Sequence, residues 1–554
     1  MILADREDLN PPTSVQNPSS VAAYNHRSSA VKKMITAKRS IRLLLLWSAA
    51  ATKMRFCAAA AATSLPADPA VAMAVGTKEK KDPTVLYRRL SALGRAPEGS
   101  VTRTLDKWVN EGSYVCADQL IRYVKELRRY QRHAHALELM EWMENTKNTK
   151  MTHINHAMRL GLIAKVRGIE AAETYFSDLP EPAKNKHTYG ALLSSYCSEK
   201  NKNADKAISL YNEMKNQNIA SNTQVHFNLM SLYMRLGQHE KVLTQYQEMK
   251  SDNIVPDTIT CCILMNCYAS LNDIESVERV IKEAEEDEKI KLRWSAYSTL
   301  ASIYCSAGLI TKAETALKKF EKLIDGRDRE PYHFLISLYS RIGNLEEVKR
   351  IWKSFRTVFR KPNNLSYLIM MRSLDKLDDI NGQQDLYEEW ESVCVTFDVW
   401  VANVMIGSYL RKNMIQQAQG VWEKASARGA VPDLKTCDMF LDYYLQNNDM
   451  DSALMWLETA ISRMKRNEWK LSQDQVDTFL KAFEDTKDVK GAERFCQCLR
   501  QLGHLDLNAY EKLLRTYLAA NATDPTLRQR IEDDKIELNS QTNKLLEMVC
   551  GANE

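Results

Sequence analysis

The sequence predicts an all-α protein built as a solenoid of stacked helix-turn-helix units. A chain of 554 residues is too long for one compact core, so several domains or a stacked array are expected. It contains only 18 Gly and 14 Pro, which is compatible with an all-helical chain. A short phrase also recurs, as SLYMRLG (231–237), SIYCSAG (302–308) and SLYSRIG (337–343). Such self-similarity is the sequence signature of repeat architectures.

The first element, residues 1–80, has the composition of an organelle transit peptide. No acidic residue lies between Asp8 and Asp68, whereas eight Lys and Arg side chains lie there among many Ser and Ala. The apolar run LLLLWSAAA (43–51) is too short to span a bilayer. A secretory signal is disfavoured because its apolar core would lie nearer the start. A disordered segment is the remaining alternative.

The chain after this leader is close to electrically neutral. The whole sequence carries a net charge of +5, of which residues 1–80 carry +6, so the remaining 65 basic and 66 acidic side chains leave −1. Bulk electrostatic binding of nucleic acid is therefore not expected of the body. The twelve cysteines lack the spacing of a secreted disulfide-rich domain, which indicates a reducing compartment.

After the leader we expect an N-terminal helical cap over 81–117, about eleven to twelve repeats over 118–520, and a charged C-terminal helix or tail over 521–554. The tyrosine of the recurring phrase marks the repeats, because it returns at steps that are near multiples of 35 residues. The positions are Tyr196, Tyr233, Tyr268, Tyr304, Tyr339, Tyr409, Tyr444 and Tyr517, with Leu374 filling the one wide gap.

Each repeat is predicted to contain two antiparallel helices. Four residues after the marker stands a residue that tolerates the left-handed conformation ending a helix. These predicted stops are Gly237, Asn272, Gly308, Gly343, Asp378, Asn413 and Asn448. A second helix follows, with a small or β-branched residue at its centre that lets neighbouring helices approach closely. These residues are Val242, Val277, Ala313, Val348, Ala418 and Ala453. Many repeats then close with a proline, as in VPD (255–257) and VPD (431–433).

With its Tyr, Gly, Ala, "EM" and "PD" positions, this unit resembles the pentatricopeptide repeat of P-class plant proteins. The stretch LMSLYMRLGQHEKVLTQYQEMKSDNIVPD (229–257) carries the pattern well. Similarity to a mitochondrial subgroup runs from about Tyr87 to Leu545. The resemblance implies a right-handed superhelix whose first helices bind single-stranded RNA, one nucleotide per repeat.

In the family that this chain resembles, two positions per repeat read the base. The first lies six residues before the marker, and the second lies at the end of the repeat. The resemblance implies that Asn403 with Asp433 reads uracil, Asn155 with Asn185 a pyrimidine, and Ser298 with Asp328 guanine. We also include His333 with Asn363, because a His ring can stack on a base. These eight residues are called the reader set below.

Other repeats depart from the family's pattern, because Phe227, Cys262 and Leu368 occupy first reader positions without a base-edge hydrogen-bonding group. A reader of ten successive nucleotides is therefore not expected.

Basic residues near the ends of first helices are candidates for phosphate contacts, and an ordinary solvated surface is the alternative. These residues are Arg235, Arg341, Arg411 and Lys412.

The sequence contains no catalytic motif, and we expect no enzyme activity, cofactor, metal or small-molecule substrate. There is no phosphate-binding glycine loop with a Lys-Ser/Thr end and no Gly-x-Ser-x-Gly elbow. Cys261, Cys262 and Cys267 lack the two paired ligand sets of a zinc site, and so do Cys496 and Cys498. We expect these thiols to be core or surface residues.

The sequence therefore predicts a non-catalytic binder of single-stranded organellar RNA in mitochondrial RNA metabolism. It would act in stabilisation, processing, splicing or translation. The alternative is a protein-interaction scaffold or a subunit of a mitochondrial ribonucleoprotein such as the ribosome. Partners would be organellar RNA and other mitochondrial RNA-processing or ribosomal proteins. A plastid is the alternative location.

Overall fold

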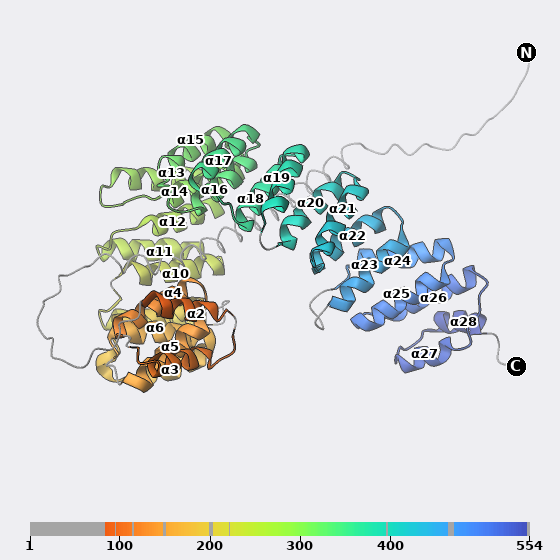
Figure 1. Ribbon diagram of the computed structural model, residues 1–554, viewed down its shortest axis with the longest axis horizontal. Helices are drawn as coiled ribbons and strands as arrows, with labels where there is room; N and C mark the ends of the chain where they lie inside the picture. Colours follow the sequence, from red (N-terminus) through yellow and green to blue (C-terminus); the bar gives the residue numbers. More distant parts are fainter. Residues whose placement is uncertain are drawn as a thin grey trace, which may run out of the picture. The chain divides into compact units, whose positions relative to one another are not determined.

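The computed structural model describes residues 83–550, except 95, 114–115, 148–150, 199–202, 221, 395–396 and 464–469. The predicted leader, residues 1–80, lies outside the described residues. Throughout the part of the chain that is described, regular structure is helical, with no strand. The chain divides into two compact units, residues 1–307 and 308–554. The prediction of an all-α solenoid of helical hairpins is confirmed within each unit (Figure 1).

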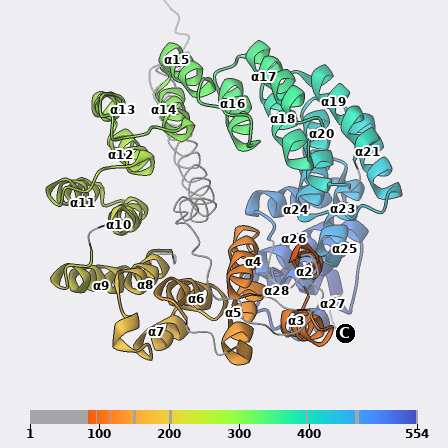
Figure 2. The same cartoon turned by 60° about the vertical axis from the view of Figure 1, so that its left-hand side comes forward.

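Unit 1 consists of hairpins in which first helices pack on first helices of the next repeat, as α6 does on α8 and α12 on α14 (Figure 2). The predicted N-terminal cap over 81–117 stays a prediction. Its helices are α2 (Pro83–Ala92), α3 (Ser100–Asn110), α4 (Ala117–Arg129), α5 (His133–Lys147), α6 (His153–Val166), α7 (Ile169–Ser177), a 3₁₀ turn η2 (Glu181–Ala183), α8 (Lys186–Ser198), α9 (Ala204–Asn216), α10 (Thr223–Leu236), α11 (His239–Ser251), α12 (Thr258–Ser270), α13 (Ile274–Glu286) and α14 (Trp294–Ala307).

Unit 2 continues the same alternation. Its helices are α15 (Ile310–Glu321), α16 (Glu330–Arg341), α17 (Leu345–Val358), α18 (Asn364–Lys376), α19 (Ile380–Val393), α20 (Val399–Arg411), α21 (Ile415–Ala427), α22 (Leu434–Gln446), α23 (Met450–Arg463), α24 (Gln473–Thr486), α25 (Val489–Leu502), α26 (Leu507–Ala519), α27 (Leu527–Asp533) and α28 (Ser540–Cys550).

The predicted helix stops all adopt left-handed backbone conformations. Gly237 has a φ of 72° and Asn413 a φ of 56°, and the other five predicted stops also have positive φ. At Gly237 the backbone N–H groups of the turn bond back to carbonyls of the last helical turn, which ends α10. Second helices end in the same way at Asn218, Asn253 and Gly429, which the sequence analysis did not identify.

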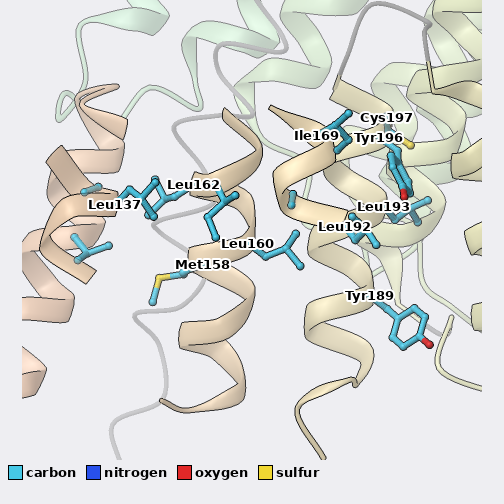
Figure 3. Close-up of a cluster of buried hydrophobic side chains, with 14 of the residues drawn as sticks. Leu137, Met158, Leu160, Leu162, Ile169, Tyr189, Leu192, Leu193, Tyr196 and Cys197 are labelled. Carbon is cyan, nitrogen blue, oxygen red and sulfur yellow. The ribbon is translucent and has the colours of Figure 1, made fainter. Parts of the chain in front are cut away.

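The small central residues of the second helices lie in the core, as predicted. Val242, Val277, Ala313, Val348, Ala418 and Ala453 are all fully buried. Each unit buries a continuous row of side chains between its two layers of helices, because one hairpin cannot cover both of its apolar faces. Figure 3 shows part of this core in unit 1, where Leu160, Leu162, Leu192 and Leu193 project from α6 and α8.

The marker tyrosines join neighbouring helices through their hydroxyl groups as well as their rings. Tyr196 donates to Glu173 at 2.8 Å, and Tyr339 donates to Glu321 at 2.6 Å. Each carboxylate belongs to the second helix that precedes the tyrosine. The phrase that marks the repeat in the sequence is therefore a packing element, and Tyr304, Tyr444 and Tyr517 also hydrogen-bond to the second helix before them.

The C-terminal segment differs from the expected single charged helix. Over 521–550 the structure has two helices, α27 and α28, and α28 packs on α26. Apolar residues spaced three or four apart explain this docking, since Leu527, Ile531, Leu546 and Val549 are all buried. Of the helices in the described ranges, none combines the length and apolar character needed to cross a bilayer.

Candidate nucleic-acid interface

The second reader position of most repeats is the N-cap of the next first helix. There the side-chain oxygen accepts a hydrogen bond from a backbone N–H of the first helical turn. This holds for Asn222, Asp257, Asn363, Asp398, Asp433, Ser472 and Asp506. The residue at this position therefore has a structural role whether or not it contacts a ligand.

Asn403 and Asp433 are directly hydrogen-bonded. The Nδ2 of Asn403 donates to Oδ1 of Asp433 at 2.9 Å, although the two residues are 30 positions apart. Thr436, which is fully buried, links them a second time: its Oγ1 lies 2.8 Å from Oδ1 of Asn403 and 2.9 Å from Oδ1 of Asp433. Asn403 is 7% exposed. The predicted pair is thus one fixed polar network at the start of α22.

His333 and Asn363 come together through Ser366. The Oγ of Ser366 donates to Oδ1 of Asn363 at 2.8 Å, and Nε2 of His333 lies 2.9 Å from the same Oγ. Since the hydroxyl has one proton, His333 is the donor in the second contact and is neutral with its proton on Nε2. Burial, together with the nearby charge of Arg329, lowers the pKa of His333 to about 4.

The His333 ring is only 6% exposed and packs against Phe355 at 5.7 Å between ring centroids. Its proposed stacking on a base stays a prediction.

The other predicted pairs are less closely organised. Asn185 lies just before α8, where its Oδ1 accepts from the backbone N of His187 at 3.0 Å. Within the described ranges no hydrogen bond joins it to Asn155. Ser298 is buried and its Oγ donates to the carbonyl of Ser295 at 3.0 Å. Asp328 is exposed and stands one residue before Arg329, the N-cap of α16. Their reader roles stay predictions.

The candidate phosphate-binding residues are engaged within the protein. Arg235 donates to the carbonyl of Cys197, Arg411 forms an ion pair with Asp375, and Lys412 pairs with Asp378 at 2.5 Å. The fourth, Arg341, is half-buried. First helices α12 and α14 contain no charged residue at all. These two first helices therefore offer no positive charge to an RNA phosphate.

The sequence analysis missed two exposed apolar side chains beside the reader positions. Trp400 is 62% exposed and Leu365 is 47% exposed. Each stands in the first turn of a first helix, three residues before a first reader position, and they are 35 positions apart. An indole exposed to this extent is unusual in a soluble protein, because it leaves a large apolar surface in water. The signal in the sequence is the 35-residue separation of Leu365 and Trp400, which equals the length of one repeat.

Six of the described cysteines are buried: Cys197, Cys261, Cys267, Cys437, Cys496 and Cys498. Burial raises the pKa of Cys261 to about 12 and that of Cys267 to about 11, so both are protonated at neutral pH. In the part of the chain that the structure covers, no three His, Cys, Asp or Glu side chains gather in a way that could hold a metal ion.

Stacked helical hairpins of about 35 residues define a helical-repeat protein. Comparison with known proteins identifies the family. The model of the "pentacotripeptide-repeat region of PRORP" matches residues 183–372. The chain belongs to the pentatricopeptide repeat family, because it also matches whole members of that family.

A mitochondrial pentatricopeptide repeat-containing protein of Arabidopsis thaliana is 39% identical over 90% of this chain and 98% of the relative. The large ribosomal subunit protein mL101 of Arabidopsis thaliana is 44% identical over 71% of this chain and 80% of the relative. The crystal structure of the pentatricopeptide repeat protein PPR10 from maize matches with a TM-score of 0.42 and 17% identity, covering 85% of this chain and 72% of that one.

Proposed function

We propose that this protein binds single-stranded RNA in mitochondria and acts there without catalysing a reaction. Membership of the pentatricopeptide repeat family supports RNA as the ligand. The names of several relatives include the word mitochondrial, which supports a location in mitochondria. Bound along a single-stranded segment, the chain would block nucleases, prevent competing RNA structure or present the RNA to processing or translation machinery.

The observation that carries the proposal is the Asn403–Asp433 network. After the hydrogen bonds described above, one N–H of the Asn403 amide and Oδ2 of Asp433 have no partner within the described residues. A donor beside an acceptor matches the edge of uracil, which offers a carbonyl oxygen beside an N3–H. Cytosine offers an amino group beside an unprotonated N3, so it presents the opposite pattern. The network is therefore selective for uracil.

Trp400 supplies a stacking surface in the same helix. It precedes Asn403 by three residues, close to one turn, so both side chains lie at the N-terminal end of α20. A base stacked on an aromatic ring gains about 1–3 kcal/mol irrespective of its identity. Stacking on Trp400 would supply affinity, and the amide and carboxylate would supply selectivity.

The test is Asp433→Asn, which exchanges the free acceptor for a donor while keeping a good N-cap. The amide oxygen must still accept from Thr436, so the amide nitrogen takes the place of Oδ2. We expect the ratio of affinities for oligouridine and oligocytidine to shift toward cytidine about tenfold, since one base-edge contact contributes about 1–3 kcal/mol of discrimination.

Asp398→Asn is the matched control. Asp398 is also an N-cap, but its partner position is Leu368, which has no hydrogen-bonding group. The control variant should leave the ratio unchanged. Equal shifts in both variants, or no shift in Asp433→Asn, would contradict the reader role of this pair.

A second candidate function is that of a structural subunit of the mitochondrial ribosome. The relative that is named as a large ribosomal subunit protein, at 44% identity, favours it. The uncharged first helices α12 and α14 favour it too, since they offer little electrostatic attraction to a phosphate backbone.

A further inference from the structure

We infer that Arg360, Lys361 and Arg372 contact the phosphates of the bound RNA, so that binding is anchored on α16–α20 instead of being spread evenly over the repeats. This inference rests on the proposed function. It goes beyond it by naming the repeats that hold the backbone and the side chains that do so.

The anchor comes from a basic segment of the sequence. Residues 348–374 contain seven Lys and Arg and no Asp or Glu. Three of the seven form ion pairs with carboxylates that lie outside this segment. Lys349 pairs with Asp379 at 2.8 Å, Arg350 with Glu321 at 2.8 Å, and Arg356 with Glu389 at 2.9 Å. These three charges contribute to packing between repeats.

The remaining four are exposed, and none has an ion-pair partner among the described residues: Lys353, Arg360, Lys361 and Arg372. Lys353 belongs to the second helix α17 and serves below as a control. Arg360 and Lys361 occupy the connection that leads into α18. Arg329 lies against this connection, since its Nη2 donates to the carbonyl of Lys361 at 3.0 Å and its guanidinium lies 5.2 Å from the centre of the Phe359 ring. The connection is therefore held in place and carries a third positive charge.

These charges lie next to the reader positions. Lys361 precedes the N-cap Asn363 by two residues. Arg372 follows Leu365 by seven residues, close to two full turns, so both project from one face of α18. Helix α18 packs directly on α20, which carries Trp400 and Asn403 (Figure 2). A strand of RNA whose base stacks on Trp400 would have its neighbouring phosphates within reach of this face.

Several other first helices have basic residues that are paired or accompanied by acidic residues. The arginines of α6 and α20, Arg159 and Arg411, are paired with Glu144 and Asp375, and Lys512 of α26 is paired with Glu484. Helices α22 and α24 have Lys435 and Lys481, but they also contain Asp438, Asp442, Asp474 and Asp477. The segment 348–374 thus places exposed basic side chains without an ion-pair partner among the described residues, and no acidic residue, beside the reader positions of α18.

The experiment compares two triple variants of the full-length chain. The anchor variant is Arg360→Ala with Lys361→Ala and Arg372→Ala. The control variant is Lys318→Ala with Lys353→Ala and Lys424→Ala, which removes three exposed lysines from second helices of the same unit. Binding of a 12-nucleotide oligouridine is measured between 50 and 300 mM salt, together with the unfolding midpoint of each variant.

The slope of log K against log salt should become shallower by about two in the anchor variant, because each phosphate contact to a single strand contributes about 0.7. The control variant should keep the slope of the unaltered chain. A slope that is unchanged in the anchor variant, or equally reduced in both variants, would overturn the anchor while leaving RNA binding intact. An unaltered chain that binds no oligouridine would instead remove the proposed function itself.

Discussion

At the scale of single residues, the side chains that we propose read a base also cap helices. Asp433 uses Oδ1 for the cap and for Asn403, which leaves Oδ2 available. A reader that is already hydrogen-bonded loses little conformational freedom on binding, so its contact with a base is gained at a lower entropic cost. In the proposed function, this network is what lets the nearly buried Asn403 contribute to selectivity.

His333 makes folding stability depend on pH. Its ring is neutral in the folded protein, with its pKa lowered from 6.5 to about 4. Between these values the unfolded chain binds the proton and the folded chain does not, so stability is complete above about pH 6.5 and is lost as the pH falls toward 4.

Replacing His333 by Gln removes this dependence. Between pH 7 and pH 5 the original chain should lose about 2 kcal/mol more unfolding free energy than the variant, as measured by urea denaturation. His187→Gln, at an exposed position, should behave as the original chain. Parallel curves for His333→Gln and the original chain would show that His333 is not buried as described.

At the scale of single helices, many first helices begin with a side-chain cap and are followed by a residue in the left-handed conformation. In α12 the cap is Asp257, whose Oδ1 accepts from the backbone N of Thr260 at 2.8 Å and from its buried hydroxyl at 2.9 Å. Phe227 stands at the first reader position of this pair. The cap persists here without a hydrogen-bonding reader, so its role in α12 is structural.

Asp257→Ala should therefore weaken the start of α12 by about 1 kcal/mol, because the first-turn N–H loses its acceptor. Amide hydrogen exchange in the first turn of α12 measures this directly. Asp328→Ala is the control, because Asp328 is exposed and is not the N-cap residue of α16. Equal exchange rates in Asp257→Ala and the original chain would contradict the capping role.

Much of each element could be predicted from the period alone. Seven stops and the small core residues of the second helices followed from one marker, because backbone conformation and close packing constrain residue type at fixed offsets. Ion pairing could not be predicted in this way. Arg411 and Lys412 were candidates for phosphates, but Asp375 and Asp378 lie 36 and 34 positions earlier and neutralise them across neighbouring repeats.

The reader set was predicted only in part for a similar reason. The sequence paired Asn403 with Asp433 through the register of the repeats, but Thr436 and Ser366, which join the pairs, have no separate signal in the sequence. Trp400 could not be predicted from the reader pattern, because that pattern concerns only groups that hydrogen-bond to a base edge. Its exposure can be known only from the fold.

At the scale of the whole molecule, the charges are distributed according to helix type. Second helices form ion pairs across repeats, such as Lys215 with Glu248 and Arg494 with Glu458. First helices α12 and α14 are uncharged. Part of the charge of a nearly neutral body thus links neighbouring repeats, and the proposed phosphate contacts use unpaired charges around α18.

The central claim is that RNA lies on α18–α22 and contacts Trp400, Asn403 and Asp433. Ultraviolet crosslinking in isolated mitochondria, followed by recovery of the chain and mass spectrometry of its peptides, tests it most directly. We predict uridine adducts on peptides from residues 397–433. A chain recovered in quantity without RNA adducts there, and accompanied only by ribosomal proteins, would contradict the claim and favour the scaffold function.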